Sequence, residues 1–155
     1  MMLGTLCAAL MALSSAPDDA SKWPVTISVW AVQALQTGGK EKQFDSGAQA
    51  VRKAVEDLPF DTFRGIFSGG VTMPTGKEAR LTLNDTYSLL LQCPSREGED
   101  AVHLDVAVEL APTAPGEPPR KAVQSCMVVR TEKMVRIGGL KMNEGEMIVV
   151  LKMTR

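Results

Sequence analysis

Alternation of apolar and polar side chains along residues 101–110, AVHLDVAVEL, constrains the fold more than any other feature of the sequence. A period of two is typical of a β-strand that buries one face and exposes the other. The apolar side chains of one face are Val102, Leu104, Val106, Val108 and Leu110, and the polar side chains of the other are His103, Asp105 and Glu109. Segments of this kind predict a sheet, because their apolar residues line up only in extended backbone.

Further strand-like stretches recur along the chain between turn-forming residues. They cover residues 25–35, 61–73, 78–83, 87–93, 122–131, 134–139 and 146–153. The last of them is apolar on both faces, so we expect its middle to be covered on both sides.

One short helix is predicted, within the stretch FDSGAQAVRKAVEDLPF that begins at Phe44. Either Asp45 or Ser46 is placed to act as its N-cap, and Pro59 ends it. The apolar residues at helical spacing are Ala48, Val51, Val55 and Leu58. Together these elements predict a single α+β domain over residues 17–155, with a short N-terminal β-α-β unit followed by a mostly antiparallel β-sheet or sandwich.

Three turn signals divide the predicted sheet. Gly69-Gly70 indicates a bulge or kink, and Asn84-Asp85 a two-residue hairpin turn. Residues 111–121 contain four prolines, so they are expected to form an exposed connection. The proline-rich residues 112–119 and Lys152 are expected to protect sheet edges in part.

The first sixteen residues carry no charged side chain and are followed at once by the polar stretch PDDASK. The length and flanks of this apolar run are typical of a secretory signal peptide and too short for a membrane span. We therefore expect residues 1–16 to be a signal peptide, with cleavage preferred between Ser14 and Ser15, and the protein to be periplasmic or in the cell envelope. A buried N-terminal helix in a cytosolic protein is the alternative.

Removal of that segment would leave Cys93 and Cys126 as the two cysteines of the exported chain. An even count in an oxidising compartment permits one disulfide. Both cysteines lie in strand-like runs, however, where single buried thiols are common. The sequence leaves the disulfide as a possibility beside two unpaired core cysteines.

The sequence is poor in groups for catalysis or metal binding, since it contains one histidine, His103. His103, Asp105 and Glu109 share a strand face, which favours a solvated surface over a metal site. The stretch GGVTMPTGKEA lacks phosphate-loop spacing, and Glu78 follows Lys77 where Ser or Thr is needed. With 18 acidic against 17 basic residues, no field favours nucleic acid. We expect no enzyme activity, no catalytic residues, no cofactor, no metal and no nucleic-acid partner.

The order of strands in the second half of the chain matches a known pattern. The matching residues of the first two strands are Leu89, Leu91 and Pro94, then Val102, Leu104, Val106, Val108 and Glu109. Those of the last two are Val123, Ser125, Met127 and Val129, then Val135, Ile137, Gly138, Gly139 and Leu140. Over about residues 87–146 the chain resembles the C-terminal β-domain of bacterial secretins, the outer-membrane gate proteins of type II and type III secretion and type IV pili. IGGL is the sharpest element of the match.

The resemblance implies a β-module that associates through strands, in which Gly138, Gly139 and Leu140 form a strand end packed near adjacent chains. The sequence contains neither the VP-x-LGDIP-x-LG segment nor the membrane-inserting hairpins of secretins, so the resemblance does not imply a pore. Two adjacent residues without a Cβ also allow a sharp turn or a close backbone approach.

Two functions follow as expectations. The first is a non-enzymatic, exported interaction or assembly module of the bacterial cell envelope, which binds a protein partner or itself through sheet edges and meets the membrane only through export or an envelope complex. The second is a domain that binds, or inhibits through binding, a small ligand or polysaccharide. A monomer whose edges are covered by the N-terminal strand and helix is the alternative to association.

Overall fold

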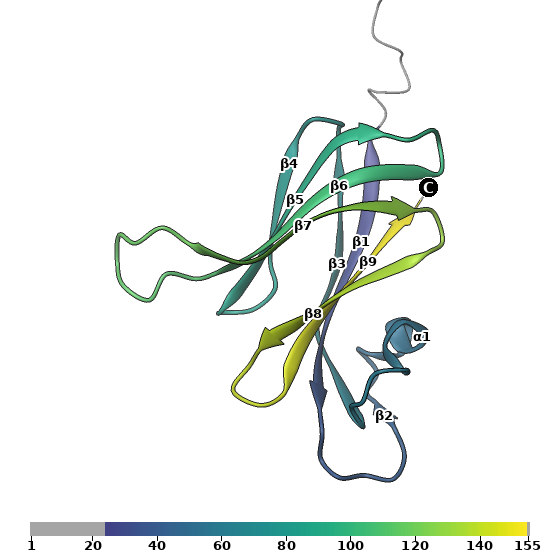
Figure 1. Ribbon diagram of the computed structural model, residues 1–155, viewed down its shortest axis with the longest axis vertical. Helices are drawn as coiled ribbons and strands as arrows, with labels where there is room; N and C mark the ends of the chain where they lie inside the picture. Colours follow the sequence, from purple (N-terminus) through teal and green to yellow (C-terminus); the bar gives the residue numbers. More distant parts are fainter. Residues whose placement is uncertain (1–23, 155) are drawn as a thin grey trace, which may run out of the picture.

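Two β-sheets face each other in the computed structural model, which describes residues 24–154 (Figure 1). The five-stranded sheet has the order β2-β3-β1-β9-β8, with bounds Gln43–Phe44, Thr62–Met73, Val25–Leu35, Glu146–Thr154 and Met134–Lys141. The four-stranded sheet has the order β4-β5-β6-β7, with bounds Glu78–Thr82, Tyr87–Arg96, Ala101–Leu110 and Arg120–Arg130. All neighbouring strands are antiparallel except β2 and β3. The predicted mostly antiparallel α+β fold is confirmed.

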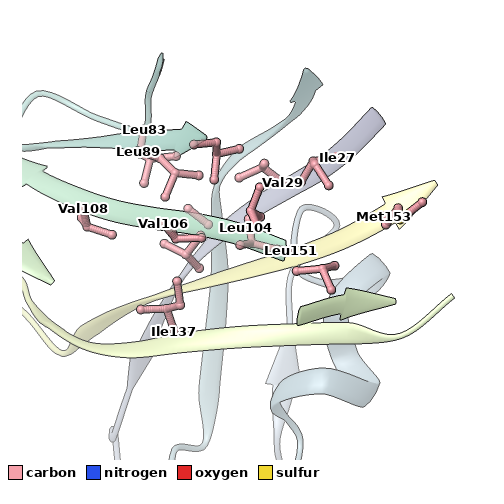
Figure 2. Packing of buried hydrophobic residues seen from close by; sticks show 14 of the residues in the cluster. Ile27, Val29, Leu83, Leu89, Leu104, Val106, Val108, Ile137, Leu151 and Met153 are labelled. Carbon is pink, nitrogen blue, oxygen red and sulfur yellow. The ribbon is translucent and has the colours of Figure 1, made fainter. Parts of the chain in front are cut away.

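The main core lies between the two sheets and is built by the alternation seen in the sequence. Val102, Leu104, Val106 and Val108 of β6 are each at most 1% exposed. Figure 2 shows Leu104 beside Val29 and Leu151 of the five-stranded sheet, with Val106 and Val108 following along β6 in the same cluster. Burial of such side chains is worth about 1.5–3 kcal/mol each, which makes this layer the main stabilising feature of the fold.

Strand β9 is buried on both faces, as its sequence predicts. Met147, Val149 and Leu151 face the main core, whereas Ile148 and Val150 face a second cluster on the outer side of the five-stranded sheet. This two-sided burial explains the continuous apolar run, because no face of the strand reaches water.

The predicted helix is present but shorter than expected. It consists of a 3₁₀ turn, η2 (Gln49–Val51), and one α-helical turn, α1 (Arg52–Val55). Its buried residues Ala48, Val51 and Val55 cover the second cluster, as the apolar spacing predicts. The expected N-cap is wrong. Ala48 holds that position, and Asp45 Oδ1 accepts hydrogen bonds from Ala48 N (3.0 Å) and Gly65 N (2.9 Å), which tie the segment to β3.

The strand directly before this helix is β2, which pairs parallel with β3, whereas the longer strand β1 pairs antiparallel with β3. The helical segment packs as a cap on one face of the five-stranded sheet. Arg136 of β8 holds the far end of the cap, through bonds to Asp57 Oδ1 (2.5 Å), Asp57 Oδ2 (3.1 Å) and Ala54 O (2.8 Å).

Two turn predictions are corrected by the strand registers. Gly69-Gly70 pairs regularly with β1, and the bulge of β3 lies at Ile66, where the register shifts opposite Ala31 and Val32. The β4–β5 connection contains four residues, 83–86, rather than two. Asn84 Oδ1 accepts from Thr86 N (2.9 Å) and Tyr87 N (2.7 Å), so an Asx-type turn closes the loop.

The exposed proline-rich connection is confirmed, because residues 111–119 form a fully exposed loop between β6 and β7. The signal peptide expected at residues 1–16 lies outside the described residues. Within residues 24–154, no helix combines the length and the apolar character needed to cross a membrane.

Candidate association edge on strand β7

The glycine pair that anchors the secretin resemblance forms a β-bulge in β8. Ile137 pairs with Val149 and Leu140 with Met147, so Gly138 and Gly139 together oppose one residue of β9. Gly139 has φ of 82°, a left-handed conformation that favours glycine. Leu140, 2% exposed, returns to the core after the bulge. The pair therefore lies within the strand, where we had expected the end of a strand.

This bulge also disrupts a free edge, because β8 is the last strand of the five-stranded sheet. The opposite edge strand, β2, has only two residues. The part of β3 beyond β2 is interrupted by the bulge at Ile66 and by Gly69 and Gly70. Bulges, short strands and glycines are common ways of making an edge unsuitable for pairing. The five-stranded sheet is therefore poorly suited to add a strand.

Lys152 does not protect an edge, contrary to the sequence-based expectation. It lies in β9, which pairs on both sides, and its Nζ is 3.2 Å from Glu132 Oε2. The N-terminal strand and the helix do not cover edges either. Strand β1 is central in its sheet, and the helical cap packs on a sheet face.

Strand β7 is the longer edge of the four-stranded sheet and pairs only with β6 within that sheet. Charged residues lie at its ends: Arg120 and Lys121 at its start and Arg130 at its finish. Residues 123–129, VQSCMVV, contain no charge, glycine, proline or register shift. This span, which we call the β7 edge, lacks the bulges, glycines and shortness found at the edges of the five-stranded sheet.

The direction of the backbone groups along the β7 edge follows from two hydrogen bonds at its end. Thr131 N donates to Asp100 O on the β6 side (2.8 Å), whereas Arg130 O turns away and accepts from Lys133 N (3.2 Å). Because peptide groups alternate along an antiparallel strand, the N–H and C=O groups of Gln124, Cys126 and Val128 point away from β6.

Side chains of the same three residues are exposed on the outer face of the sheet. Among residues 24–154, Val128 is the one large hydrophobic side chain that is exposed, at 38%. The β7 edge thus combines outward-pointing backbone groups with one exposed apolar side chain, that of Val128.

The two cysteines are free thiols in the structure, so the possible Cys93–Cys126 disulfide is not formed. Cys93 is fully buried in the main core, and Cys126 is exposed on the outer face. Burial raises the pKa of the Cys93 thiol. A hydrogen bond with Asp105, and then the negative charge of that carboxylate, raises the pKa of the Cys126 thiol. Neither environment activates a thiolate nucleophile.

The polar face of β6 does not assemble into a site. His103 Nε2 lies 3.9 Å from Glu97 Oε2, while Asp105 faces Cys126. Glu109, 8% exposed, pairs with Arg80 Nη1 at 2.7 Å. Among residues 24–154, no three His, Cys, Asp or Glu side chains lie together as a metal site requires.

A polar hollow of about 520 Å³ lies between the β4–β5 loop and the β8–β9 loop. Its lining residues are Gln33, Asn84, Thr86, Tyr87, Lys141, Met142, Asn143 and Glu144. Several of its polar groups are already used, since Tyr87 Oη donates to Lys141 O (2.6 Å) and Gln33 Nε2 to Glu144 O (2.8 Å). Trp30, which could serve an aromatic ligand site if it were exposed, packs on the second cluster, and Trp23 lies outside the described residues.

No family model, curated protein or solved structure matches the chain. The β7 edge is a feature that sequence reasoning missed, because its position depends on the order of the strands in the sheet.

Proposed function

We propose that the protein is a non-enzymatic, exported interaction module of the bacterial cell envelope, with a secretin-like β-domain and no pore of its own. The observation that carries this proposal is the β7 edge, where Gln124, Cys126 and Val128 direct backbone groups outward and the Val128 side chain is exposed. A strand from a protein partner would extend the four-stranded sheet at this edge.

The energetics favour a recognition role for this edge. Each backbone hydrogen bond gained on strand addition contributes about 0.5–1.5 kcal/mol net, and several form together along one strand. Burial of Val128 would add to this gain. The strands that resemble the secretin β-domain include β5, β6 and β7, so the proposed binding surface belongs to that region.

Binding of a small ligand or polysaccharide is the second candidate. The polar hollow favours it, because amide side chains such as Asn84 and Asn143 can hydrogen-bond sugar hydroxyls. Titration with cell-wall oligosaccharides, followed by NMR shifts at Asn84 and Asn143, tests this candidate directly.

Site-specific photo-crosslinking in the native host tests the interaction function. A photoreactive residue in place of Gln124 lies on the β7 edge, and the same residue in place of Gln92 is the matched control. Gln92 is also exposed on the outer face but belongs to the central strand β5. We expect crosslinked protein adducts from position 124 only, in the envelope fraction. Recovery in the cytoplasm, or no adduct from position 124, would contradict the proposal.

A further inference from the structure

We infer that the partner of the β7 edge is a second copy of this chain, paired antiparallel to the first with Cys126 opposite Cys126 of the other copy. The inference rests on the proposed interaction function and names its partner. The two four-stranded sheets would then join into one continuous sheet across a two-fold axis.

The backbone of the β7 edge limits the registers available to such a pair. Only Gln124, Cys126 and Val128 present outward N–H and C=O groups along the span, so these residues must form the hydrogen-bonded pairs. Centring on Cys126 matches Gln124 of one copy with Val128 of the other, and it uses all three residues in both copies. If one copy were shifted by a single residue, its outward N–H and C=O groups would face residues of the other copy whose backbone groups are already bonded to β6.

Charge separates the remaining registers. A register centred on Ser125 would bring Arg120 of one copy opposite Arg130 of the other, which is repulsive. Centring on Cys126 moves these arginines apart. It also places Glu132, which follows the strand, is 74% exposed and pairs with Lys152 of its own copy, at the end where Arg120 and Lys121 of the other copy lie.

Side chains on the outer face support the same register. Val128 lies opposite Gln124 of the second copy and diagonal to its Cys126, within reach of both. Pairing would therefore cover the one strongly exposed apolar side chain on this edge in both copies at once. A partner unrelated in sequence would have to supply this complementarity separately.

Purified full-length protein tests the inference without any envelope component. Sedimentation at increasing concentration should show a monomer–dimer equilibrium, and a short bis-maleimide should crosslink the dimer through Cys126. The full-length chain contains a third cysteine, Cys7, so the experiment is done with Cys7→Ser in the background. In that background Cys126→Ser should abolish the crosslink and retain the dimer, because Cys93 is buried and out of reach.

Two substitutions should weaken dimerisation at least tenfold while leaving the monomer folded. Val128→Lys places like charges near the two-fold axis, with Gln92→Lys on the same face as the charge-matched control. Val128→Pro removes an N–H that points away from β6, so the β6–β7 ladder keeps its bonds. Circular dichroism and the melting temperature confirm that each variant folds.

A strict monomer at every concentration, with no Cys126 crosslink, would overturn the self-pairing. Adducts from position 124 to a different protein in the native host would then leave the proposed interaction function standing. If neither a dimer nor any adduct from position 124 were found, both the self-pairing and the interaction function would be overturned. A dimer weakened equally by Gln92→Lys and Val128→Lys would also overturn the inference, because its interface would then lie elsewhere.

Discussion

At the scale of single residues, the two adjacent glycines of β8 have different requirements. Gly139 has φ of 82°, whereas Gly138 does not lie in the left-handed region, and a Cβ at either position would meet no atom within 4 Å. Only backbone conformation therefore separates the two positions. Gly139→Ala should reduce the free energy of unfolding by about 1 kcal/mol, because an L-residue is strained there. Gly138→Ala is the control, and urea denaturation of both variants measures the difference. Equal effects would contradict the bulge geometry.

Gly145 in the β8–β9 turn is more restricted than either residue of that pair. Its φ is 70°, and a Cβ would lie 2.0 Å from the carbonyl oxygen of Ala34. Strain and a backbone clash act together, so Gly145→Ala should lower the free energy of unfolding by more than about 1 kcal/mol, and by more than Gly139→Ala does. Thermal melts of the two variants side by side test this order, and a smaller effect at Gly145 would refute it.

Asp61 makes stability depend on pH at the base of the β1–β2 loop. Its carboxylate accepts bonds from the backbone N–H groups of Thr37, Gly38 and Gly39 and from the hydroxyls of Thr37 and Thr62. These bonds, led by the Thr37 N–H, hold the pKa of Asp61 well below its ordinary value of 3.8. Because the pKa of Asp61 is lower in the folded state than in the unfolded state, its ionised carboxylate stabilises the fold at neutral pH. This stabilisation is lost progressively as the pH falls below about 4.

Asp61→Asn should therefore destabilise the protein at pH 7 and reduce the loss of stability on acidification. Asp57→Asn is a useful comparison. The pKa of Asp57 is also lowered, but by its hydrogen bond with Arg136 in another part of the fold. Denaturation midpoints at pH 7 and pH 3 measure both effects. An unchanged acid dependence in Asp61→Asn would show that other carboxylates control it.

At the scale of secondary-structure elements, the helical cap and β9 depend on each other. Ile148 is 1% exposed and packs in the cluster that the cap covers. Ile148→Ala should cost about 2–5 kcal/mol through lost burial and the cavity left behind. Chemical denaturation measures the cost, and hydrogen exchange should show that amides of the cap lose protection first. The exposed Ser68→Ala in β3 serves as the control, and a cap unaffected by Ile148→Ala would argue against this coupling.

Prediction from sequence succeeded where one local pattern decides the structure. The limits of β1 and the two-sided burial of β9 follow from residues 25–35 and 146–153 alone, because each side chain's face depends only on its position along the strand. The bulge of β3 was misplaced, because its position at Ile66 depends on the register against β1. The helix was overextended, since Asp45 is bonded to β3 and is not free to cap a longer helix. The β7 edge needed the strand order, which no segment of the sequence contains.

At the scale of the whole molecule, the first and last described strands are neighbours, since β1 pairs with β9 over residues 26–34 and 146–154. A deletion of residues 146–154 should abolish folding, because it removes β9, which joins β1 to β8. Far-UV circular dichroism and dye binding of the truncated chain check this. A cooperative thermal transition in the truncated chain would contradict it.

The same β1–β9 pairing has a consequence in time. Each contact across this pair joins residues separated by nearly the full described chain, and such long-range closure makes folding slow compared with helical proteins. During synthesis the five-stranded sheet stays incomplete until β9 has left the ribosome, so the growing chain has no finished core to resist threading. The order of the strands therefore delays completion of the core until the last strand is available.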